Sequence, residues 1–369
     1  MPSEEVTLLD AIYSPDKISQ PVLIHDRIEF HNVSSLERLA ELPGLMLSRY
    51  PREVRESLAT LSQADGISVR MAQESTGCEL RFVAAFAHTT RLFLSSPFYD
   101  TTVQVFCGDY AQSEVALPAG RLVTLELMPP ANFCDVAAQP LAAGSRFAPQ
   151  VWRVIGNRAP VFYHGIDANG CEVRPPRADE KPRLRLLAYG SSITHGTWKS
   201  YPYQAGFRLG LDVLNKGLAG SCFCQPEIAE HLACGETWDI ATLELGVNMR
   251  GRFTPDEFRA RASQLIATLR RHHPAAPLGV ITTFPNYADH LKDRTRVEAV
   301  RDAAYRDILR EIVAAQHNER VLLIEGSGML PVMGGLSTDL LHPSEFGQMV
   351  MGERLAEALR PLLALLPAG

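Results

Sequence analysis

The stretch Tyr189–Gly196, which reads YGSSITHG, determines how the second half of the chain is interpreted. It follows an apolar run at 184–188 that has the character of a β-strand. In open α/β sheets, functional groups gather where strands end in such turns, at the carboxyl edge of the sheet. A serine there can be exposed and rigidly held. Ser192 is therefore the candidate nucleophile, and the rest of the chain is interpreted around it.

Five strand patterns alternate with helical patterns after residue 180. The strands are expected at Leu184–Tyr189, Asp212–Asn215, Ile240–Leu245, Leu278–Thr283 and Val321–Glu325. Strands that alternate with helices form parallel sheets with both faces covered, and their crossovers are right-handed. We therefore expect a three-layer α/β/α domain.

Three helices of this half carry clear signals. Thr254 precedes a proline at the first helical position and has Glu257 at capping-box spacing, which marks a helix start. Apolar residues three and four apart predict a second helix over about 292–316. A last helix is expected from Pro343 past Leu359.

The first half has the alternating pattern of antiparallel β-structure. Apolar residues two positions apart recur every roughly 8–13 residues, with turn residues between several runs, as in sandwiches and barrels. They are Ile67 and Val69, Leu80 and Phe82, Leu92 and Leu94, Val103 and Val105, Val115 and Leu117, and Val123, Leu125 and Leu127. Val151–Ile155 and Val161–Tyr163 would be the last strands. The pattern predicts a β-sandwich-like or jelly-roll-like domain.

Short helices are also expected in this half. Ser34 and Glu37 have capping-box spacing, and Pro51 opens a helical pattern that runs to about Ser62.

The segment Arg174–Arg183 (RPPRADEKPR) contains three prolines and six charged residues. It cannot be a core strand and is interpreted as an interdomain linker. With a boundary near Ala178, the β-rich domain occupies residues 1–178 and the α/β domain residues 179–369.

The composition narrows the class of protein. A length of 369 residues, 46% hydrophobic content and 21% charged content suit a globular protein of two domains. A net charge of −6 predicts no nucleic-acid partner, and no apolar run approaches the roughly 18 residues of a membrane span. The N-terminus MPSEEVTLLD has no signal-peptide pattern, and the seven cysteines lack framework spacing. A cytoplasmic location is expected, with secretion only if a leader preceded this sequence.

Several common motifs are missing. The elbow G-x-S-x-G is absent because Thr194 stands where its second glycine is required. There is no phosphate-binding lysine loop and no HExxH pair. Gly326-Ser327-Gly328 lacks a third glycine, so a dinucleotide site is not expected. Alone, the pair Ser191 and Ser192 is more often a helix cap than a nucleophile.

Polar residues after the other strands favour the interpretation of Ser192 as a nucleophile over its interpretation as a helix cap. Gly220 follows the second strand, Asn248 the third, and Asp339 and His342 the fifth. Each residue alone could be a turn or a cap. Because all follow strands of one parallel sheet, they can converge on Ser192.

These residues resemble the SGNH (GDSL-type) hydrolase family over about residues 184–360. Gly190-Ser191-Ser192-Ile193-Thr194 is similar to its first motif block, Gly220 to the second, Asn248 to the third and Asp339-x-x-His342 to the last. The family usually has aspartate where Ser191 stands and often has it where Met249 stands. The resemblance implies a flavodoxin-like sheet and ester hydrolysis without metal or cofactor. Members with a leading β-rich domain resemble carbohydrate esterases.

The expected mechanism follows from the residue types. His342 would accept the proton of Ser192 as a general base, and Asp339 would fix its tautomer. The N–H groups of Ser192 and Gly220 and the amide of Asn248 would form an oxyanion hole.

The expected function is hydrolysis of short acyl esters, above all acetyl, of a carbohydrate or another small molecule. A lipase, thioesterase or acyltransferase on the same residues is the alternative among enzymes. A non-catalytic carbohydrate-binding protein is the alternative outside enzymes. An edge strand of the sandwich could support a homo-oligomer, though nothing requires one.

A few residues have two interpretations. Glu244 within an apolar run is expected to pair with Arg250 or another base, and otherwise to steady the Asn248 loop. His195 is interpreted as a loop residue. The cysteines Cys222, Cys224 and Cys234 lack two ligand pairs and are interpreted as small buried thiols, so no metal is expected. The aromatic residues that could line a pocket or be core are Trp198, Tyr201, Tyr203, Phe284 and Tyr287.

Overall fold

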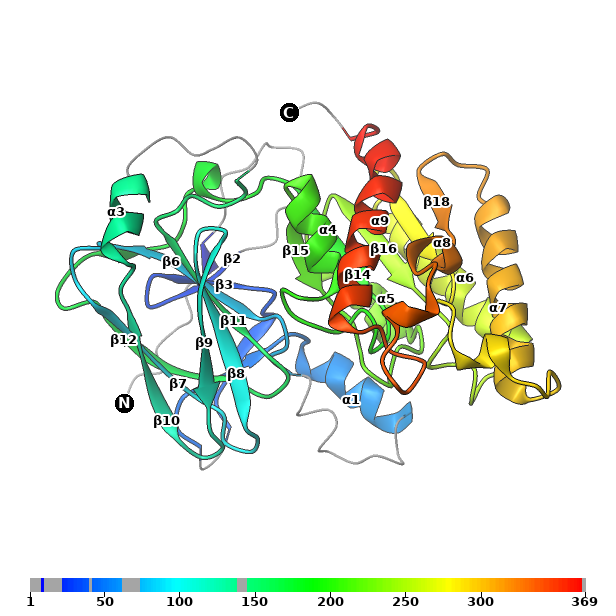
Figure 1. Ribbon diagram of the computed structural model, residues 1–369, viewed down its shortest axis with the longest axis horizontal. Helices are drawn as coiled ribbons and strands as arrows, with labels where there is room; N and C mark the ends of the chain where they lie inside the picture. Colours follow the sequence, from blue (N-terminus) through cyan, green and yellow to red (C-terminus); the bar gives the residue numbers. More distant parts are fainter. Residues whose placement is uncertain (1–7, 10–21, 40–41, 62–73, 138–144, 367–369) are drawn as a thin grey trace. The chain divides into compact units, whose positions relative to one another are not determined.

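The computed structural model of the chain describes residues 8–9, 22–39, 42–61, 74–137 and 145–366 (Figure 1). They form two compact units that divide between Arg183 and Leu184, with helix α1 counted in the second unit from Glu56 onward. None of the described helices is long and apolar enough to span a bilayer.

The first unit contains two antiparallel sheets among its described residues. One has the order β1-β2-β3-β6-β11-β8-β9, with β13 also beside β6, and the other has the order β10-β7-β12-β5-β4. The bounds in the first sheet are β1 Leu8–Leu9, β2 Val22–His25, β3 Ile28–His31, β6 Glu79–Ala84, β8 Thr101–Cys107, β9 Tyr110–Leu117, β11 Val151–Gly156 and β13 Val173–Arg174. Those in the second are β4 Ser35–Glu37, β5 Leu45–Ser48, β7 Thr90–Ser95, β10 Leu122–Leu127 and β12 Phe162–Asp167.

The alternating apolar residues form the core between these sheets. Leu80 and Phe82 from one sheet and Leu92 and Leu94 from the other are at most 1% exposed and lie in one cluster with Trp152. This confirms the antiparallel fold expected from the period of two. The predicted positions Ile67 and Val69 lie outside the described residues.

One predicted helix of this unit is wrong. Ser35–Glu37 of this segment form strand β4, which pairs with β5 in the register Ser35 to Ser48. The Ser34 hydroxyl donates to the carbonyl of Arg49, while Glu37 accepts from the Ser35 hydroxyl and pairs with Arg55. The helix predicted after Pro51 is present as α1, Arg52–Leu61. A further short helix, α3, spans Ala131–Ala137.

Charged side chains are buried on the other face of the first sheet. Glu79 is 0% exposed, Arg81 is 1% and Arg153 is 2%. The Glu79 carboxylate lies 2.9 Å from Nε of Arg81 and accepts a hydrogen bond of 2.5 Å from Nε of Arg153. Both guanidinium groups lie over the ring of Phe147, at 4.8 and 3.9 Å from its centroid. Burial acts to raise the pKa of Glu79, but Arg153 and Arg81 outweigh it and lower that pKa to about 2.

The proline-rich segment is anchored to the first unit. Glu180, in the short helix η1 at Ala178–Glu180, accepts two hydrogen bonds of 2.7 Å from the Arg174 guanidinium. Its neighbour Lys181 pairs with Glu29 on β3. The two units therefore divide after Arg183, whereas the sequence places the boundary near Ala178.

The second unit contains a parallel sheet of five strands in its described part, in the order β15-β14-β16-β17-β18. This is the flavodoxin-like order 2-1-3-4-5, as expected. The bounds are β14 Arg185–Tyr189, β15 Asp212–Asn215, β16 Ile240–Glu244, β17 Leu278–Ile281 and β18 Val321–Ile324. Each predicted strand is therefore present, with ends that differ by at most two residues.

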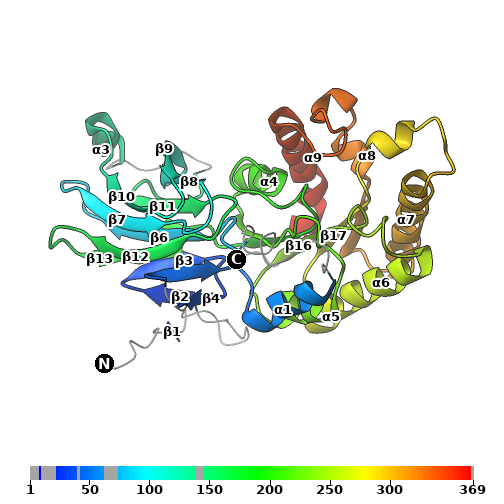
Figure 2. The same ribbon diagram turned by 90° about the horizontal axis from the view of Figure 1, so that it is seen from below.

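Helices cover this sheet on both faces, with α4 and α9 on one side and α5 and α6 on the other (Figure 2). The core beneath α4 and α9 joins Leu186 of β14 and Ile240 of β16 to Leu355. The bounds are α4 Tyr201–Leu209, α5 Pro226–Cys234, α6 Pro255–His272, η2 Tyr287–His290, α7 Val297–Ala314, α8 Gly326–Met329, η3 Met333–Gly335 and α9 Glu345–Leu363.

The helix starts follow their caps. The capping box of Thr254 and Glu257 at the start of α6 is present as predicted. The last helix begins at Glu345 rather than at Pro343, because the Ser344 hydroxyl caps it by accepting a bond from the Gly347 N–H.

The buried charges of the first unit yield a stability prediction. Replacing Glu79 with alanine leaves Arg81 and Arg153 without their carboxylate, so we expect the free energy of unfolding to fall by about 3–5 kcal/mol. The exposed Glu126, which pairs with Arg91 at the surface, is the matched control, and its loss should cost less than about 1 kcal/mol. Urea unfolding measures both, and equal losses in the two variants would contradict the prediction.

Glu79 also contributes to the loss of stability in acid. Because its pKa in the fold is lowered from 4.5 to about 2, its contribution is present above pH 4.5. That contribution is lost as the pH falls through about 2.

Candidate active site

The turn that carries Ser192 begins directly after β14. Gly190 is required there, because a Cβ at this position would lie 2.6 Å from Oε2 of Glu244. Ser191 is 1% exposed and buried beneath the turn, and its carbonyl accepts a hydrogen bond of 2.9 Å from the N–H of His195. Ser192 is half-buried, so its hydroxyl is held at an accessible edge.

A buried carboxylate supports this turn from below. Oε2 of Glu244, at the end of β16, accepts hydrogen bonds of 2.6 Å from the N–H of Ser191 and 2.7 Å from its hydroxyl. The Thr194 hydroxyl donates a third bond of 3.1 Å to the same oxygen. The parallel pairing of β14 with β16, which sets Tyr189 beside Leu243, brings this carboxylate under the turn.

The prediction that Glu244 pairs with Arg250 is wrong. Arg250 instead donates to Asp302 over 2.6 Å and to the Asn286 amide over 3.0 Å. Glu244 is 0% exposed. Its burial raises the pKa from 4.5 to about 7, against the opposing effect of the bonds from Ser191 and Thr194.

The hydroxyl of Ser192 lies next to the imidazole of His342, which in turn lies next to the carboxylate of Asp339. Its Oγ lies 2.7 Å from Nε2 of His342, and Nδ1 of that ring lies 2.6 Å from Oδ2 of Asp339. Oδ1 of Asp339 accepts bonds of 2.9 Å from the N–H groups of Leu341 and His342 and a bond of 2.8 Å from the Ser337 hydroxyl. Partial burial acts to raise the pKa of Asp339, but its bonds from His342, Leu341 and Ser337 hold it well below the usual range.

The loop of Asp339 and His342 is anchored to its neighbours. Leu340 has a φ of 55°, a left-handed conformation, and its carbonyl accepts a bond of 2.8 Å from the Tyr287 N–H. In the first turns of α9, the Gln348 amide donates to the carbonyl of Ile193 over 3.2 Å and accepts from the N–H of Tyr201 over 2.7 Å. Gln348 therefore ties α9 to the turn of Ser192. Gln348 is not predicted from the sequence, because a single glutamine gives no local signal.

Asn248 is oriented by the loop that contains Gly220. Its Oδ1 accepts a bond of 3.2 Å from the Cys222 N–H, so the other end of the amide is the donor. Gly220 lies in the same loop and has a φ of 69°, which glycine adopts without strain. Asn248 is half-buried and Gly220 is exposed, so the strand-end loops after β15 and β16 meet as expected.

The aromatic residues proposed for a pocket divide into two groups. Tyr201 and Phe284, at 0% and 1% exposure, pack edge to face in the core, so their prediction as pocket residues is wrong. Tyr203 is also buried. Trp198 and Tyr287 are half-buried, and the Tyr287 hydroxyl accepts a bond of 3.0 Å from Arg250. Only these two remain available at the surface.

The cysteines also divide. Cys222 and Cys224 are buried free thiols, as predicted, but Cys234 is exposed, so its interpretation as a buried thiol is wrong. Cys234 ends α5 at the surface of the unit.

A hydroxyl, an imidazole and a carboxylate in this geometry can activate the serine oxygen for attack on a carbonyl carbon. Together with a flavodoxin-like sheet, they define the class of protein as an SGNH-type esterase. Residues 188–350 match the model of the GDSL-like lipase/acylhydrolase family. Over this region the chain is similar to that family.

Solved structures share the fold of both units. A salicylyl-acyltransferase from a tetracycline biosynthetic pathway is 16% identical, with 97% of this chain and 98% of that chain covered and a TM-score of 0.73. A family two carbohydrate esterase from Clostridium thermocellum is 15% identical, with 79% and 94% covered and a TM-score of 0.56. An acetyl xylan esterase from the rumen bacterium Butyrivibrio proteoclasticus is 12% identical, with 93% and 98% covered and a TM-score of 0.53. Among curated protein sequences, none matches the chain.

The support from Glu244 can be tested by substitution. We expect Glu244→Ala to lower kcat by about 10²-fold, because the orphaned Ser191 N–H lets the turn shift. Glu244→Gln keeps an acceptor oxygen for Ser191 and should stay close to the wild-type kcat. An unchanged kcat in Glu244→Ala would contradict the role of this carboxylate.

The raised pKa of Glu244 predicts a pH dependence of stability. Its contribution is fully present below pH 4.5 and is lost as the pH rises through about 7. The wild type should therefore lose stability relative to Glu244→Gln over this interval. Urea unfolding of both proteins at the two ends of the interval measures the difference, and a constant difference would show that Glu244 does not titrate there.

Proposed function

We propose that the chain is a serine esterase that removes short acyl groups, acetyl foremost, from a carbohydrate or another small molecule. The observation that carries the proposal is the pair of contacts at 2.7 Å between Ser192 and His342 and 2.6 Å between His342 and Asp339. An imidazole that is bound to a carboxylate and lies beside a serine hydroxyl can accept the proton of that hydroxyl, which is the arrangement of a catalytic triad.

The proposed reaction has two halves. As Oγ of Ser192 bonds to the ester carbonyl carbon, its proton moves to Nε2 of His342. The C–O bond to the alcohol then breaks and the alcohol takes that proton, which leaves an acyl-enzyme. Water repeats the sequence and releases the acid. Asp339 compensates the imidazolium in both halves.

The proposed oxyanion hole consists of the N–H groups of Ser192 and Gly220 and the amide of Asn248. The bond between Asn248 and the Cys222 N–H supports this assignment, because it leaves the amide donor for the substrate. Donors fixed before the reaction stabilise a developing oxyanion without reorganisation.

The open position of the site supports a bulky alcohol. The side chains of His342 and Asp339 are 41% and 49% exposed, so a sugar or a chain of sugars can approach them. The carbohydrate esterase and acetyl xylan esterase with the same fold support this substrate class by analogy.

Acyl transfer to an alcohol is the second candidate. Leu340, beside His342 in sequence, is 45% exposed, and Phe346 and Met349 at the start of α9 are 60% and 55% exposed. These apolar side chains can bind an acceptor that takes the acyl group in place of water. The fold shared with a salicylyl-acyltransferase over nearly the whole chain supports this candidate.

A series of p-nitrophenyl esters from acetate to octanoate tests the class and the acyl length. We expect the highest kcat/KM with acetate and no activity in Ser192→Ala, while the exposed Ser327→Ala remains active. A preference for octanoate would favour a lipase. Activity that survives in Ser192→Ala would contradict the proposal, and a wild type without activity on any ester would favour a binding protein.

Adding an alcohol acceptor separates hydrolysis from transfer. With p-nitrophenyl acetate and a sugar in excess, an esterase releases mainly acetate, whereas a transferase releases mainly the acetylated sugar. Chromatographic quantification of both products gives the ratio.

Asn248→Ala tests the oxyanion hole. Losing one donor should lower kcat by about 10²–10³, with the folded state intact by circular dichroism. Asn318→Ala, at an exposed loop position, is the control. Wild-type turnover in Asn248→Ala would remove this residue from the mechanism.

A further inference from the structure

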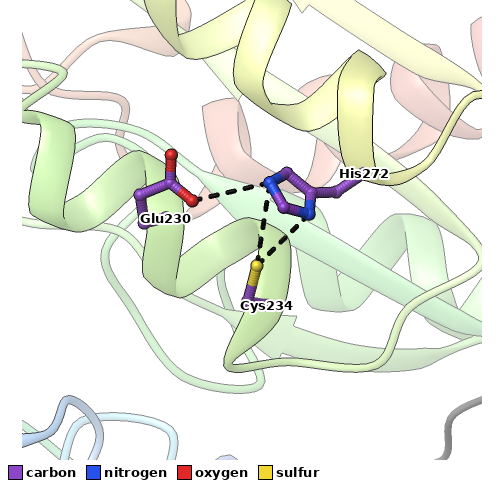
Figure 3. Close-up of side chains that lie close together, drawn as sticks. All are labelled: Glu230, Cys234 and His272. Carbon is purple, nitrogen blue, oxygen red and sulfur yellow. Dashed lines mark hydrogen bonds and ion pairs between the residues drawn. The ribbon is translucent and has the colours of Figure 1, made fainter.

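The ends of α5 and α6 bring three metal-ligating side chains together, away from Ser192. Glu230 and Cys234 are four residues apart on α5, so they lie on one face of that helix. His272 is the last residue of α6, which packs beside α5. Their ligand atoms all lie within 4.8 Å of one another, and the imidazole faces both the carboxylate and the thiol (Figure 3).

We propose that Glu230, Cys234 and His272 bind a zinc ion, with water as a fourth ligand. Nε2 of His272 lies 3.6 Å from Oε2 of Glu230 and 3.9 Å from Sγ of Cys234. Tetrahedral coordination with Zn–N of about 2.0 Å and Zn–S of about 2.3 Å requires separations of roughly 3.5 Å. Small rotations of exposed side chains therefore complete the geometry.

The donor set selects the metal. A thiolate and an imidazole in tetrahedral positions favour Zn²⁺, whereas Mg²⁺ and Ca²⁺ prefer sites made only of oxygen. Arg271 donates to Oε1 of Glu230 over 3.0 Å, so Oε2 is the oxygen that faces His272. On binding, the thiol of Cys234 releases its proton to solvent as the Zn–S bond forms.

The backbone adds an independent argument for a cation. Cys234 and His272 are each the last residue of their helix. The C-terminal end of a helix carries partial negative charge, and here two such ends meet. A bound cation would neutralise both ends and the thiolate together.

The position of the site predicts a structural effect. Cys234 precedes β16 and His272 precedes β17 along the chain, so the site lies at the amino ends of these strands. Ser192 follows β14 and lies at the opposite, carboxyl edge. Zinc would thus link α5 to α6 without touching the reacting groups.

Cobalt serves as a spectroscopic substitute for zinc. We expect untagged, fully reduced wild type to show a thiolate-to-cobalt charge-transfer band on titration with Co²⁺, and equimolar Zn²⁺ to remove it. Cys234→Ser should lose the band, and Cys171→Ser, at a half-buried cysteine of the first unit, should keep it. No band in the wild type, or a band that persists in Cys234→Ser, would overturn the site.

Thermal unfolding gives a second readout. Zinc at about 100 times its dissociation constant should raise Tm by roughly 5–10 °C for a unit of this size. The increase should be absent in Cys234→Ser and much smaller in Glu230→Gln. Equal increases in all three proteins would show that zinc binds elsewhere.

Discussion

The second unit depends on a carboxylate buried under the turn that follows β14. Glu244 accepts both the N–H and the hydroxyl of Ser191, and this fixes the backbone that presents Ser192. A glycine at 190 is needed to leave room for it. An ionised carboxylate without a cationic partner is costly to bury, and burial raises its pKa to about 7. This costly burial occurs directly beneath the turn that positions Ser192, where a shift of the backbone would lower activity the most.

The loops around Ser192 are joined to one another by side chains and backbone. Gln348 links α9 to the turn at Ile193, Tyr287 holds the loop of His342 through Leu340, and Cys222 orients Asn248. Two of these bonds join loops that follow different strands, and the third joins α9 to the turn after β14. The geometry of the site is therefore a property of the whole carboxyl edge, and its residues need no deep cavity to be held in place.

Local patterns predicted much of this arrangement, and contacts between distant residues account for what they missed. Strand and helix positions follow from apolar periodicity and caps, and Gly220, Asn248, Asp339 and His342 follow from their place after strands. The partners of Glu244 are about 50 residues away, at Ser191 and Thr194, so sequence alone favoured the wrong pair. The exposure of single side chains could not be predicted from the sequence either, because tertiary packing buries Tyr201 and Phe284 in the core. It also exposes Cys234 beside His272.

The central claim is that Ser192 is the activated nucleophile. The most direct measurement is covalent labelling with a fluorophosphonate, followed by peptide mapping by mass spectrometry. We expect stoichiometric labelling on the peptide that carries Ser192, and we expect it to be lost in His342→Ala, where the base is missing. Labelling at another serine, or equally fast labelling without His342, would contradict it.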